Sequence, residues 1–380
     1  MSFEGWTHLN DQQREKLFDT ILGKGNSFSK VWLLQHIDFP SIHNECRLQI
    51  KQYYNGPCGA VASIQAWLVK TLLFGDVGKI PRHLSEKEKL IELRKRGLIG
   101  ALSEILFSVT PYRRGPVRLI VPFPPDGTIE ESVFYNSWHY ATLYSVEALH
   151  DVISRHFDNI CRYGMVPLLC SMIFSRGADR VHIEAAKDTL VDPAQEDCFQ
   201  PLVNLILTGR AVSNVFDAPK TATEDDHPKV AKYGIIARST IGFMTSVELT
   251  NKIFTVGSHF KTPFLPIWVI HGDFHYSLLF SDSREVISEE PTGQKFFWYT
   301  VTSSNGTLLN KQYTLTVDTA DSVSSRAPKM EDSLKVVRDC VNLRWPSAEL
   351  GIQGVATEKK VCQKSHAFST SSESSMSTSK

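Results

Sequence analysis

Cys58 is the residue whose type and surroundings best suit nucleophilic catalysis. It follows a tight Asn-Gly-Pro turn at residues 55–57 and begins an apolar, alanine-rich run that ends near Phe74. The turn chemistry and the spacing of the apolar residues predict that Cys58 lies in the first turn of a helix. Unpaired backbone N–H groups and the helix dipole favour a thiolate there, so a lowered pKa is expected. The alternative is that Cys58 is a small buried hydrophobic residue, as free cysteines commonly are.

Gln52 and His275 complete a candidate catalytic set. Gln52 lies on the near side of the turn before Cys58, where its amide could donate to an oxyanion beside the sulfur. His275 begins the second of two short apolar runs, residues 268–271 and 275–280, which together predict a β-hairpin. A cysteine with a distant histidine is typical of cysteine peptidases. His271, on the first run, is the competing base.

These motifs resemble the MINDY family of deubiquitinases, which are cysteine isopeptidases that trim polyubiquitin. The resemblance rests first on Gln52 and Cys58 around the Asn-Gly-Pro turn and on the string HYSLLFS that starts at His275. Further matches are most similar to the family's fourth branch and extend over most of residues 30–352. They include residues 208–217 (TGRAVSNVFD), 234–243 (GIIARSTIGF), 261–268 (KTPFLPIW) and 344–347 (RWPS).

The resemblance implies a cysteine-dependent deubiquitinase that hydrolyses isopeptide bonds in polyubiquitin, with a preference for long 48-linked chains. Cys58 would attack the carbonyl of ubiquitin's C-terminal glycine, and His275 would protonate the leaving lysine amine. The side chain of Gln52 and the backbone N–H of Cys58 would bind the oxyanion. The glycines on either side of Pro57-Cys58 would leave room for the narrow Gly-Gly tail of ubiquitin.

A third catalytic residue, which would orient the imidazole, is not evident in the sequence. The strand expected after the histidine, residues 296–302, has no carboxylate. The local options are Thr300, Thr302, Asn305 and Asp282. Two hypotheses therefore stand: an active deubiquitinase, or a pseudo-deubiquitinase that binds ubiquitin chains without cutting them.

The order of expected elements gives an α+β protein, with a mostly helical first half and a late antiparallel sheet. The resemblance implies a papain-like arrangement, in which the helix of Cys58 packs on the sheet that carries the histidine. Strands are expected at residues 254–257, 267–271, 275–280 and 295–301, with a hairpin turn at Asn305-Gly306. A helix is expected over residues 241–250. A capping box at residues 85–88 predicts a helix to about Arg96 that Gly97 ends, with a second helix over 99–107.

We expect one catalytic domain over residues 1–352. From about residue 353 the apolar periodicity is lost, and residues 353–380 are expected to form a disordered, Ser/Thr-rich tail.

The overall composition narrows the possible partners. Lys+Arg and Asp+Glu are both 41, so charge gives no case for nucleic acid or an anionic membrane. No apolar run approaches the roughly 18 residues of a membrane-spanning helix, and no signal peptide is evident. The seven cysteines show neither zinc spacing nor a disulfide framework. We therefore expect an intracellular protein, cytoplasmic or nuclear, without metal or cofactor. Its expected partners are ubiquitin and polyubiquitin chains, and a monomer is the default oligomeric state.

Overall fold

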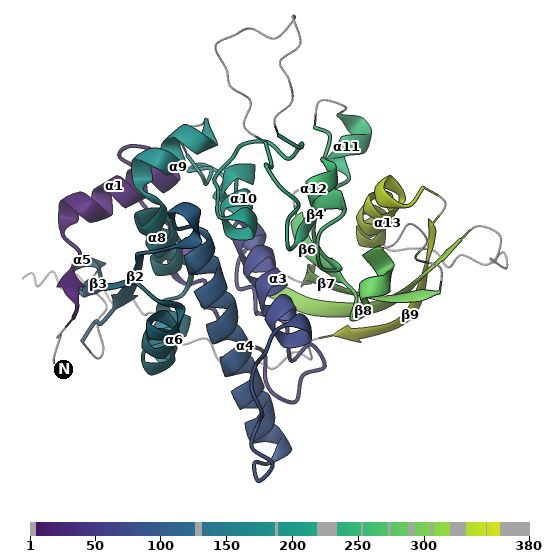
Figure 1. The fold of residues 1–380 in the computed structure, drawn as a ribbon, viewed down its shortest axis with the longest axis horizontal. Coiled ribbons are helices and arrows are strands. Elements are labelled where there is room, and N and C mark those ends of the chain that lie inside the picture. The colour runs from purple at the N-terminus through teal and green to yellow at the C-terminus, as the bar shows by residue number, and fades with distance from the viewer. Residues whose placement is uncertain are drawn as a thin grey trace, which may run out of the picture.

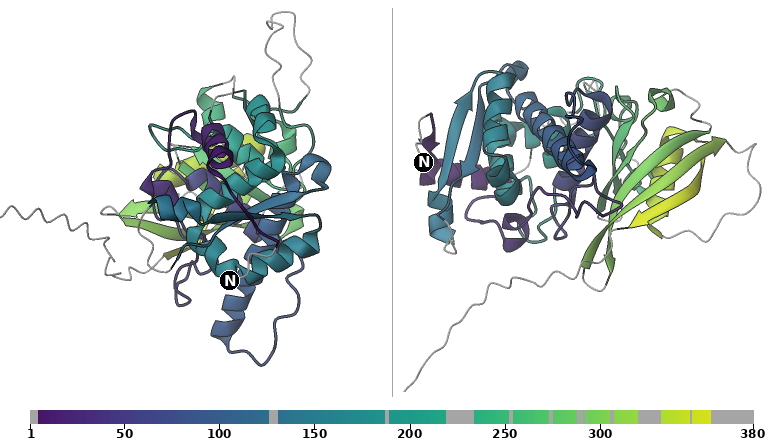
Figure 2. Two further views of the ribbon diagram at one scale, coloured as in Figure 1. Left: turned by 90° about the vertical axis from the view of Figure 1, so that its left-hand side faces the viewer. Right: turned by 90° about the horizontal axis from the view of Figure 1, so that it is seen from below.

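The computed structural model describes residues 5–125, 131–186, 189–218, 234–251, 254–272, 275–287, 291, 293–304, 307–319, 332–346 and 348–357. A layer of helices separates a small three-stranded sheet from a larger six-stranded sheet (Figures 1 and 2). The mixture of helices and sheets agrees with the expected α+β class. Within the described residues, no helix is long and apolar enough to cross a membrane.

The helices are α1 (Asp11–Leu22), α2 (Lys30–Leu33), α3 (Cys58–Phe74), α4 (Glu86–Ser108), α5 (Glu131–Asn136), α6 (Val146–Arg155), α7 (Phe157–Tyr163), α8 (Met165–Arg176), α9 (Ala178–Ala185), α10 (Gln200–Thr208), α11 (Val247–Thr250), α12 (Ser258–Lys261) and α13 (Asp332–Arg344). Short 3-10 turns are η1 (Pro111–Arg113) and η2 (Arg284–Ile287). The strands are β1 (Thr7–His8), β2 (Val117–Pro122), β3 (Trp138–Leu143), β4 (Gly242–Thr245), β5 (Ile267–Gly272), β6 (His275–Phe280), β7 (Gln294–Ser304), β8 (Thr307–Thr319) and β9 (Ala348–Thr357).

Helix α3 lies at the centre of the molecule, between the other helices and the larger sheet (Figure 1). Its alanines let neighbouring elements approach closely, and it contacts α4 and α10 on one side and β5 and β6 on the other. The indole Nε1 of Trp67 donates to the carbonyl of Ile206 in α10 at 2.9 Å. The prediction of a helix that starts at Cys58 and ends near Phe74 is confirmed.

Helix α4 runs without a break from Glu86 to Ser108, so the two shorter helices expected there are wrong. The expected capping box at Ser85 is present. Gly97 does not end the helix. A Cβ at this position would lie 2.6 Å from Cδ2 of Leu72 in α3. The glycine therefore lets α4 pack closely against α3 and does not end the helix.

The larger sheet has the order β4-β5-β6-β7-β8-β9. All neighbouring pairs are antiparallel except β4 and β5, which run parallel. The sheet is therefore mixed, whereas an antiparallel sheet was expected. Of the helix expected over residues 241–250, only the short α11 (Val247–Thr250) is present. Residues 242–245 form β4, because Phe243 and Met244 are fully buried on opposite faces of the sheet. Residues 254–257 form no strand.

Each face of the larger sheet is covered by its own helix. On the face toward α3, which we name the α3 face, the strands contribute a set of buried side chains: Phe243, Ile267, Val269, Tyr276, Leu278, Phe280 and Tyr299. On the opposite face, the α13 face, they contribute Met244, Trp268, Ile270, Leu279, Phe296 and Trp298. Successive strand residues alternate between these two faces, as a pleated strand requires.

The predicted hairpins are present. Strands β5 and β6 pair through Gly272 and His275, and β7 and β8 pair through Ser304 and Thr307. The turn residues Asn305 and Gly306 lie outside the described residues.

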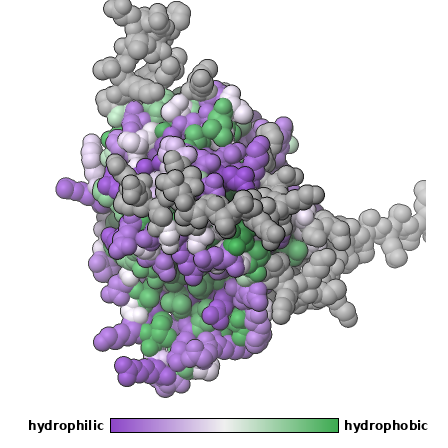
Figure 3. All heavy atoms as spheres, turned by 90° about the vertical axis from the view of Figure 1, so that its right-hand side faces the viewer, coloured by the Kyte–Doolittle hydropathy of each residue, from purple (hydrophilic) through white to green (hydrophobic). Residues whose placement is uncertain are grey.

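Strand β9 pairs with β8 and ends at Thr357, so regular structure continues beyond the boundary expected at residue 352. Residues 358–380 lie outside the described part, and the disordered tail stays a prediction. The side chains of Ile352 and Val355 on β9 are exposed. Figure 3 views the molecule from the sheet side, where hydrophobic residues lie among hydrophilic ones and gather in the lower half.

Candidate active site

Cys58 is the first residue of α3, as predicted, but its thiol is buried. Only 4% of its surface is exposed, and burial raises its pKa to about 11, with a smaller contribution from the charge of Asp197. Backbone N–H groups of Tyr276, Gly59 and Cys58 oppose this rise. The expectation of a lowered pKa is therefore wrong for the resting site, because desolvation of a thiolate outweighs the donors of the helix terminus.

The thiol occupies a gap between two strands of the sheet. The ladder between β6 and β7 begins only at Leu278 and Tyr299, so β6 is unpaired with β7 at Tyr276. The backbone N–H of Tyr276 is instead directed to the thiol of Cys58. The splayed strands thus provide the sulfur with a donor that a continuous sheet would use for itself.

Gln52 and Cys58 line the same cavity, which has a volume of only about 20 Å³. Gln52 is 3% exposed, and its Nε2 donates to the carbonyl of Tyr54 at 2.8 Å. The structure therefore brings the expected oxyanion donor to the sulfur, but the amide is already engaged. A space of this size has room for about one water molecule and not for a peptide. A peptide tail can enter only if the site opens.

His275 lies on the hairpin that α3 contacts, but its side chain is not joined to Cys58. His275 pairs with Gly272 of β5. A Cβ added to Gly272 would meet the side chain of Ser246 and would lie 2.5 Å from Cγ1 of Val336 in α13. Cross-strand partners share a face, so alternation assigns His275 to the α13 face, together with Ser277. The Nε2 atom of His275 is buried and has no hydrogen-bond partner among the residues that the structure describes. Burial lowers the pKa of its imidazole to about 4, so the ring is neutral at pH 7.

His271, the competing base, is on the α3 face. It pairs with Tyr276, and the two rings stack at 4.4 Å between centroids. Its Nδ1 lies 3.1 Å from Oγ1 of Thr245 on β4. The Tyr276 ring also reaches the first turn of α3, where its Cε2 would be 3.2 Å from a Cβ on Gly59. The phenol ring therefore contacts both His271 and the helix that carries the nucleophile.

None of the options for a third catalytic residue hydrogen-bonds to His275 in the part of the chain that the structure describes. Thr300 lines the cavity beside Cys58, where its carbonyl accepts from Nε2 of Gln49 at 3.1 Å. Thr302 is half-buried, and Asp282 is exposed. Asn305 lies outside the described residues. The imidazole thus has no orienting partner in the resting site.

The segment before α10 covers the nucleophile turn and was not expected from the sequence. Val191 and Cys198 form a β-bridge, and the carbonyl of Glu196 accepts from Nε1 of Trp32 at 2.9 Å. Gly56 has a φ of +98°, and a Cβ there would lie 2.7 Å from the carbonyl oxygen of Glu196. A Cβ on Gly59 would lie 2.9 Å from Cβ of Cys198. The space expected for a Gly-Gly tail is therefore filled by this segment.

Cys198 is the nearest unforeseen thiol. Its Sγ donates to the carbonyl of Gly56 at 3.5 Å, and backbone N–H groups of Gly59 and Ala60 also face it. Burial raises its pKa well above the ordinary value, and the charge of Cys58 adds to this rise. The sequence held no signal for this proximity, because the two cysteines are far apart in the chain and no local spacing joins them.

We also searched the described residues for side chains that could hold a metal ion. Within the described ranges, no group of three or more histidine, cysteine or acidic side chains could hold a metal ion. The cysteines at positions 46, 58, 161, 170, 198 and 340 are free. The chemistry available at this site is therefore that of a thiol, an imidazole and amide donors.

The fold and the site define a mixed α+β protein organised around a cysteine at the start of a central helix. The chain belongs to the MINDY-3/4 family: residues 16–354 match the family model described as "Deubiquitinating enzyme MINDY-3/4, conserved domain". The resemblance inferred from the motifs is thereby confirmed.

Similar proteins carry names of the same family. The mouse (Mus musculus) protein named "Probable ubiquitin carboxyl-terminal hydrolase MINDY-4" is 32% identical over 344 residues, which are 86% of this chain and 44% of the relative. The Danio rerio "Ubiquitin carboxyl-terminal hydrolase MINDY-3" is 26% identical over 280 residues, 66% of this chain and 60% of the relative. This chain thus spans less than half the length of the mouse relative. No solved structure matches the chain.

Proposed function

We propose that this chain is a cysteine-dependent deubiquitinase that hydrolyses isopeptide bonds in polyubiquitin, with 48-linked chains as its preferred substrate. The observation that carries the proposal is that Cys58 and Gln52 line one cavity. Cys58 lies in the first turn of α3, and this helix packs on the hairpin that contains His275. The names of the family model and of the relatives support the class of reaction. The linkage preference rests on the resemblance alone.

In the proposed reaction, Sγ of Cys58 attacks the carbonyl carbon of ubiquitin's C-terminal glycine. His275 takes the thiol proton and then delivers it to the departing lysine amine, which leaves a thioester on Cys58. The Gln52 amide and the Cys58 backbone N–H bind the oxyanion. Water then hydrolyses the thioester and releases the C-terminal carboxylate of ubiquitin.

The reaction requires the resting site to open. The thiol and the imidazole are both buried and neutral at pH 7, and the Gln52 amide is bound to Tyr54. We propose that ubiquitin binding displaces the segment over residues 191–198 and brings His275 to Cys58. Binding energy would then be used to assemble the catalytic groups, which limits cleavage to the correct substrate.

A second function deserves a test because the same resting geometry supports it. A pseudo-deubiquitinase would keep the fold and bind ubiquitin chains, and its unpartnered His275 would never reach the sulfur. The two functions differ in product. We would incubate the chain with tetraubiquitin of each linkage and follow release of shorter chains, with the Cys58→Ala variant as control. Cleavage that Cys58→Ala abolishes supports the enzyme, whereas binding of chains without any cleavage supports the pseudoenzyme.

A further inference from the structure

We propose that a second pocket, remote from Cys58, binds a small anion that carries several phosphate groups. The pocket lies where η1, the start of α9, the end of α10 and the segment before β4 meet. It has a volume of about 410 Å³, within the range of small-molecule sites. Helix α10 separates it from Cys58: the first turn of α10 lies beside α3 and its last turn borders the pocket.

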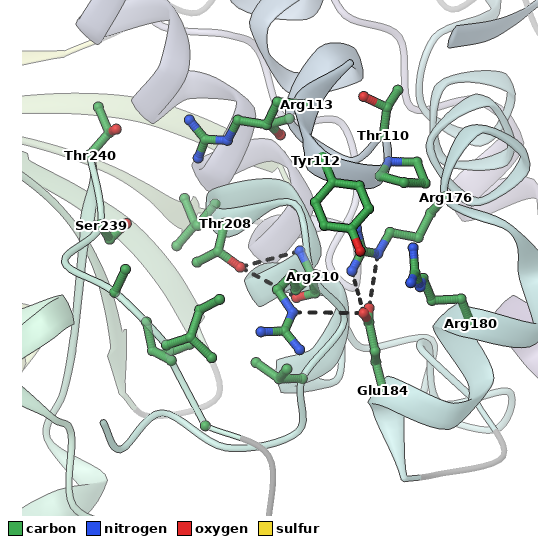
Figure 4. A pocket seen from close by; sticks show the side chains of 18 of the residues that line it. Thr110, Tyr112, Arg113, Arg176, Arg180, Glu184, Thr208, Arg210, Ser239 and Thr240 are labelled. Carbon is green, nitrogen blue, oxygen red and sulfur yellow. Dashed lines mark hydrogen bonds and ion pairs between the residues drawn. The ribbon is translucent and has the colours of Figure 1, made fainter. Parts of the chain in front are cut away.

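The lining of this pocket is strongly basic. Five arginines border it, at positions 113, 176, 180, 210 and 238, together with one carboxylate, Glu184. The chain as a whole has a formal net charge of zero, so this concentration of one sign is not a property of the composition. Figure 4 shows Arg113, Arg180 and Arg210 on different sides of the pocket around the ring of Tyr112.

Glu184 neutralises only part of this charge. It is 7% exposed and forms a buried ion pair with Arg176, in which Nε of the arginine lies 3.0 Å from Oε2 (Figure 4). Arg176 also donates to the carbonyl of Val109 at 3.1 Å. The Nε of Arg210 is 3.7 Å from the same carboxylate, beyond hydrogen-bond length. We therefore treat the Arg176–Glu184 pair as a structural wall of the pocket and Arg210 as only partly compensated.

The backbone N–H groups of Arg113 and Arg180 bond to the carbonyls of Thr110 and Gly177. Their guanidinium groups form neither a hydrogen bond nor an ion pair with any of the described residues. The guanidinium of Arg238 donates to the carbonyls of Thr262 and Pro263, and no carboxylate of the described residues pairs with it. Among the residues that the structure describes, five arginines thus line a concave site with Glu184 as the one acidic side chain. An anion that enters would gain Coulomb attraction from several sides, which is stronger than on a flat surface.

The guanidinium chemistry favours phosphate. Its planar fork of N–H donors matches two oxygens of a phosphate, and it stays charged at all physiological pH values. A single carboxylate would balance only one of the free arginines. A ligand with adjacent phosphates would engage Arg113, Arg180 and Arg210 together. Tyr112 and Arg113 also hold left-handed φ angles of 56° and 55°, which non-glycine residues rarely adopt.

The test uses the full chain and inositol hexakisphosphate as the probe, with affinity measured by isothermal titration calorimetry. We expect wild-type protein to bind and the double variant Arg113→Gln/Arg180→Gln to bind about tenfold or more weakly. Arg82→Gln, an exposed arginine outside the pocket, is the matched control and should bind within about twofold of wild type. The melting temperature of each ligand-free variant checks that the fold is intact.

Two further binding measurements identify the kind of anion that the pocket prefers. Vesicles of phosphatidylcholine with and without phosphatidylinositol 4,5-bisphosphate test a lipid headgroup, with inositol hexakisphosphate as competitor. A polyglutamate peptide tests an acidic protein segment. The proposal is overturned if wild type does not bind inositol hexakisphosphate, if Arg82→Gln weakens it as much as the double variant, or if the peptide binds more tightly through the same arginines. Because every readout is binding, failure of the proposed deubiquitinase activity would not affect this result.

Discussion

The backbone N–H of Tyr276, and not the imidazole of His275, faces the thiol of Cys58 in the resting site. Both catalytic candidates are present on adjoining elements, yet each is buried and neutral. The contact arises because β6 and β7 are unpaired at Tyr276. If Cys58 is the nucleophile, as we propose, this arrangement keeps it unreactive until the hairpin or the covering segment rearranges.

The rate at which a small alkylating agent labels Cys58 should depend on pH as expected for a thiol with a high pKa. We expect the rate of labelling by iodoacetamide to rise about tenfold for each pH unit from 7 to about 10, because the pKa of about 11 leaves little thiolate below that range. Mass spectrometry of the Cys58 peptide separates it from the other cysteines. A rate that is already maximal at pH 7 would mean that a thiolate–imidazolium pair exists in the free protein.

The buried imidazole of His275 should make the fold sensitive to acid. Its folded pKa of about 4 is below the unfolded value of about 6.5, so the unfolded state binds more protons between these values. Stability is therefore lost as the pH falls from about 6.5 toward 4, by about 2 kcal/mol at pH 5. We expect His275→Leu to remove this part of the loss in urea unfolding measured at pH 7 and pH 5.

Replacement of an exposed histidine, His83→Leu, is the control for that measurement. It should leave the difference in unfolding free energy between the two pH values as in wild type. If His275→Leu behaves in the same way, His275 is not buried in solution.

Gln52 should act on the rate of chain cleavage rather than on substrate binding. Loss of an oxyanion donor typically costs about 3 kcal/mol, so Gln52→Ala should lower kcat about a hundredfold and leave KM nearly unchanged. Gln49 lines the same cavity but donates to the carbonyl of Thr300, and Gln49→Ala is the matched control. An equal loss in both variants would indicate damage to the cavity and not to the oxyanion site.

A carboxylate placed opposite His275 should supply its missing partner. If the β6–β7 ladder continued past Leu278 and Tyr299, Thr302 would lie opposite His275. Thr302→Asp should then raise the rate of labelling by a ubiquitin probe. Val301→Asp is the comparison, because Val301 is on the other face of the strand and lines the cavity of Cys58, where a carboxylate would disfavour the thiolate and slow labelling. Faster labelling of Val301→Asp, or no change in either variant, would show that the two strands do not close in this register.

Local patterns in the sequence predicted the elements that carry the candidate site. The turn before Cys58, the α3 helix and the β5–β6 hairpin each have signals within a few residues, and all are found. The wrong predictions concern residues whose secondary structure depends on contacts with distant parts of the chain. Gly97 was expected to end a helix, but its missing side chain makes room for Leu72 of a different helix. Residues 242–245 form a strand because β5 pairs with them in parallel, from far along the chain.

The closed state of the site had no local signal either. Burial of Cys58 depends on Glu196 and Cys198, which reach the nucleophile turn only after the chain has folded. The sequence can therefore indicate candidate groups for the chemistry, while their pKa values depend on neighbours that local spacing does not identify.

The most direct test of the central claim is the reaction of the full chain with ubiquitin-propargylamide, followed by mass spectrometry of the adduct. We predict a covalent adduct on Cys58 at pH 7.5, formed under conditions in which iodoacetamide barely modifies the same residue. The contrast would show that ubiquitin binding activates a thiol that the resting fold keeps protonated. Absence of an adduct, or an adduct on Cys198, would contradict the assignment of Cys58 as the nucleophile.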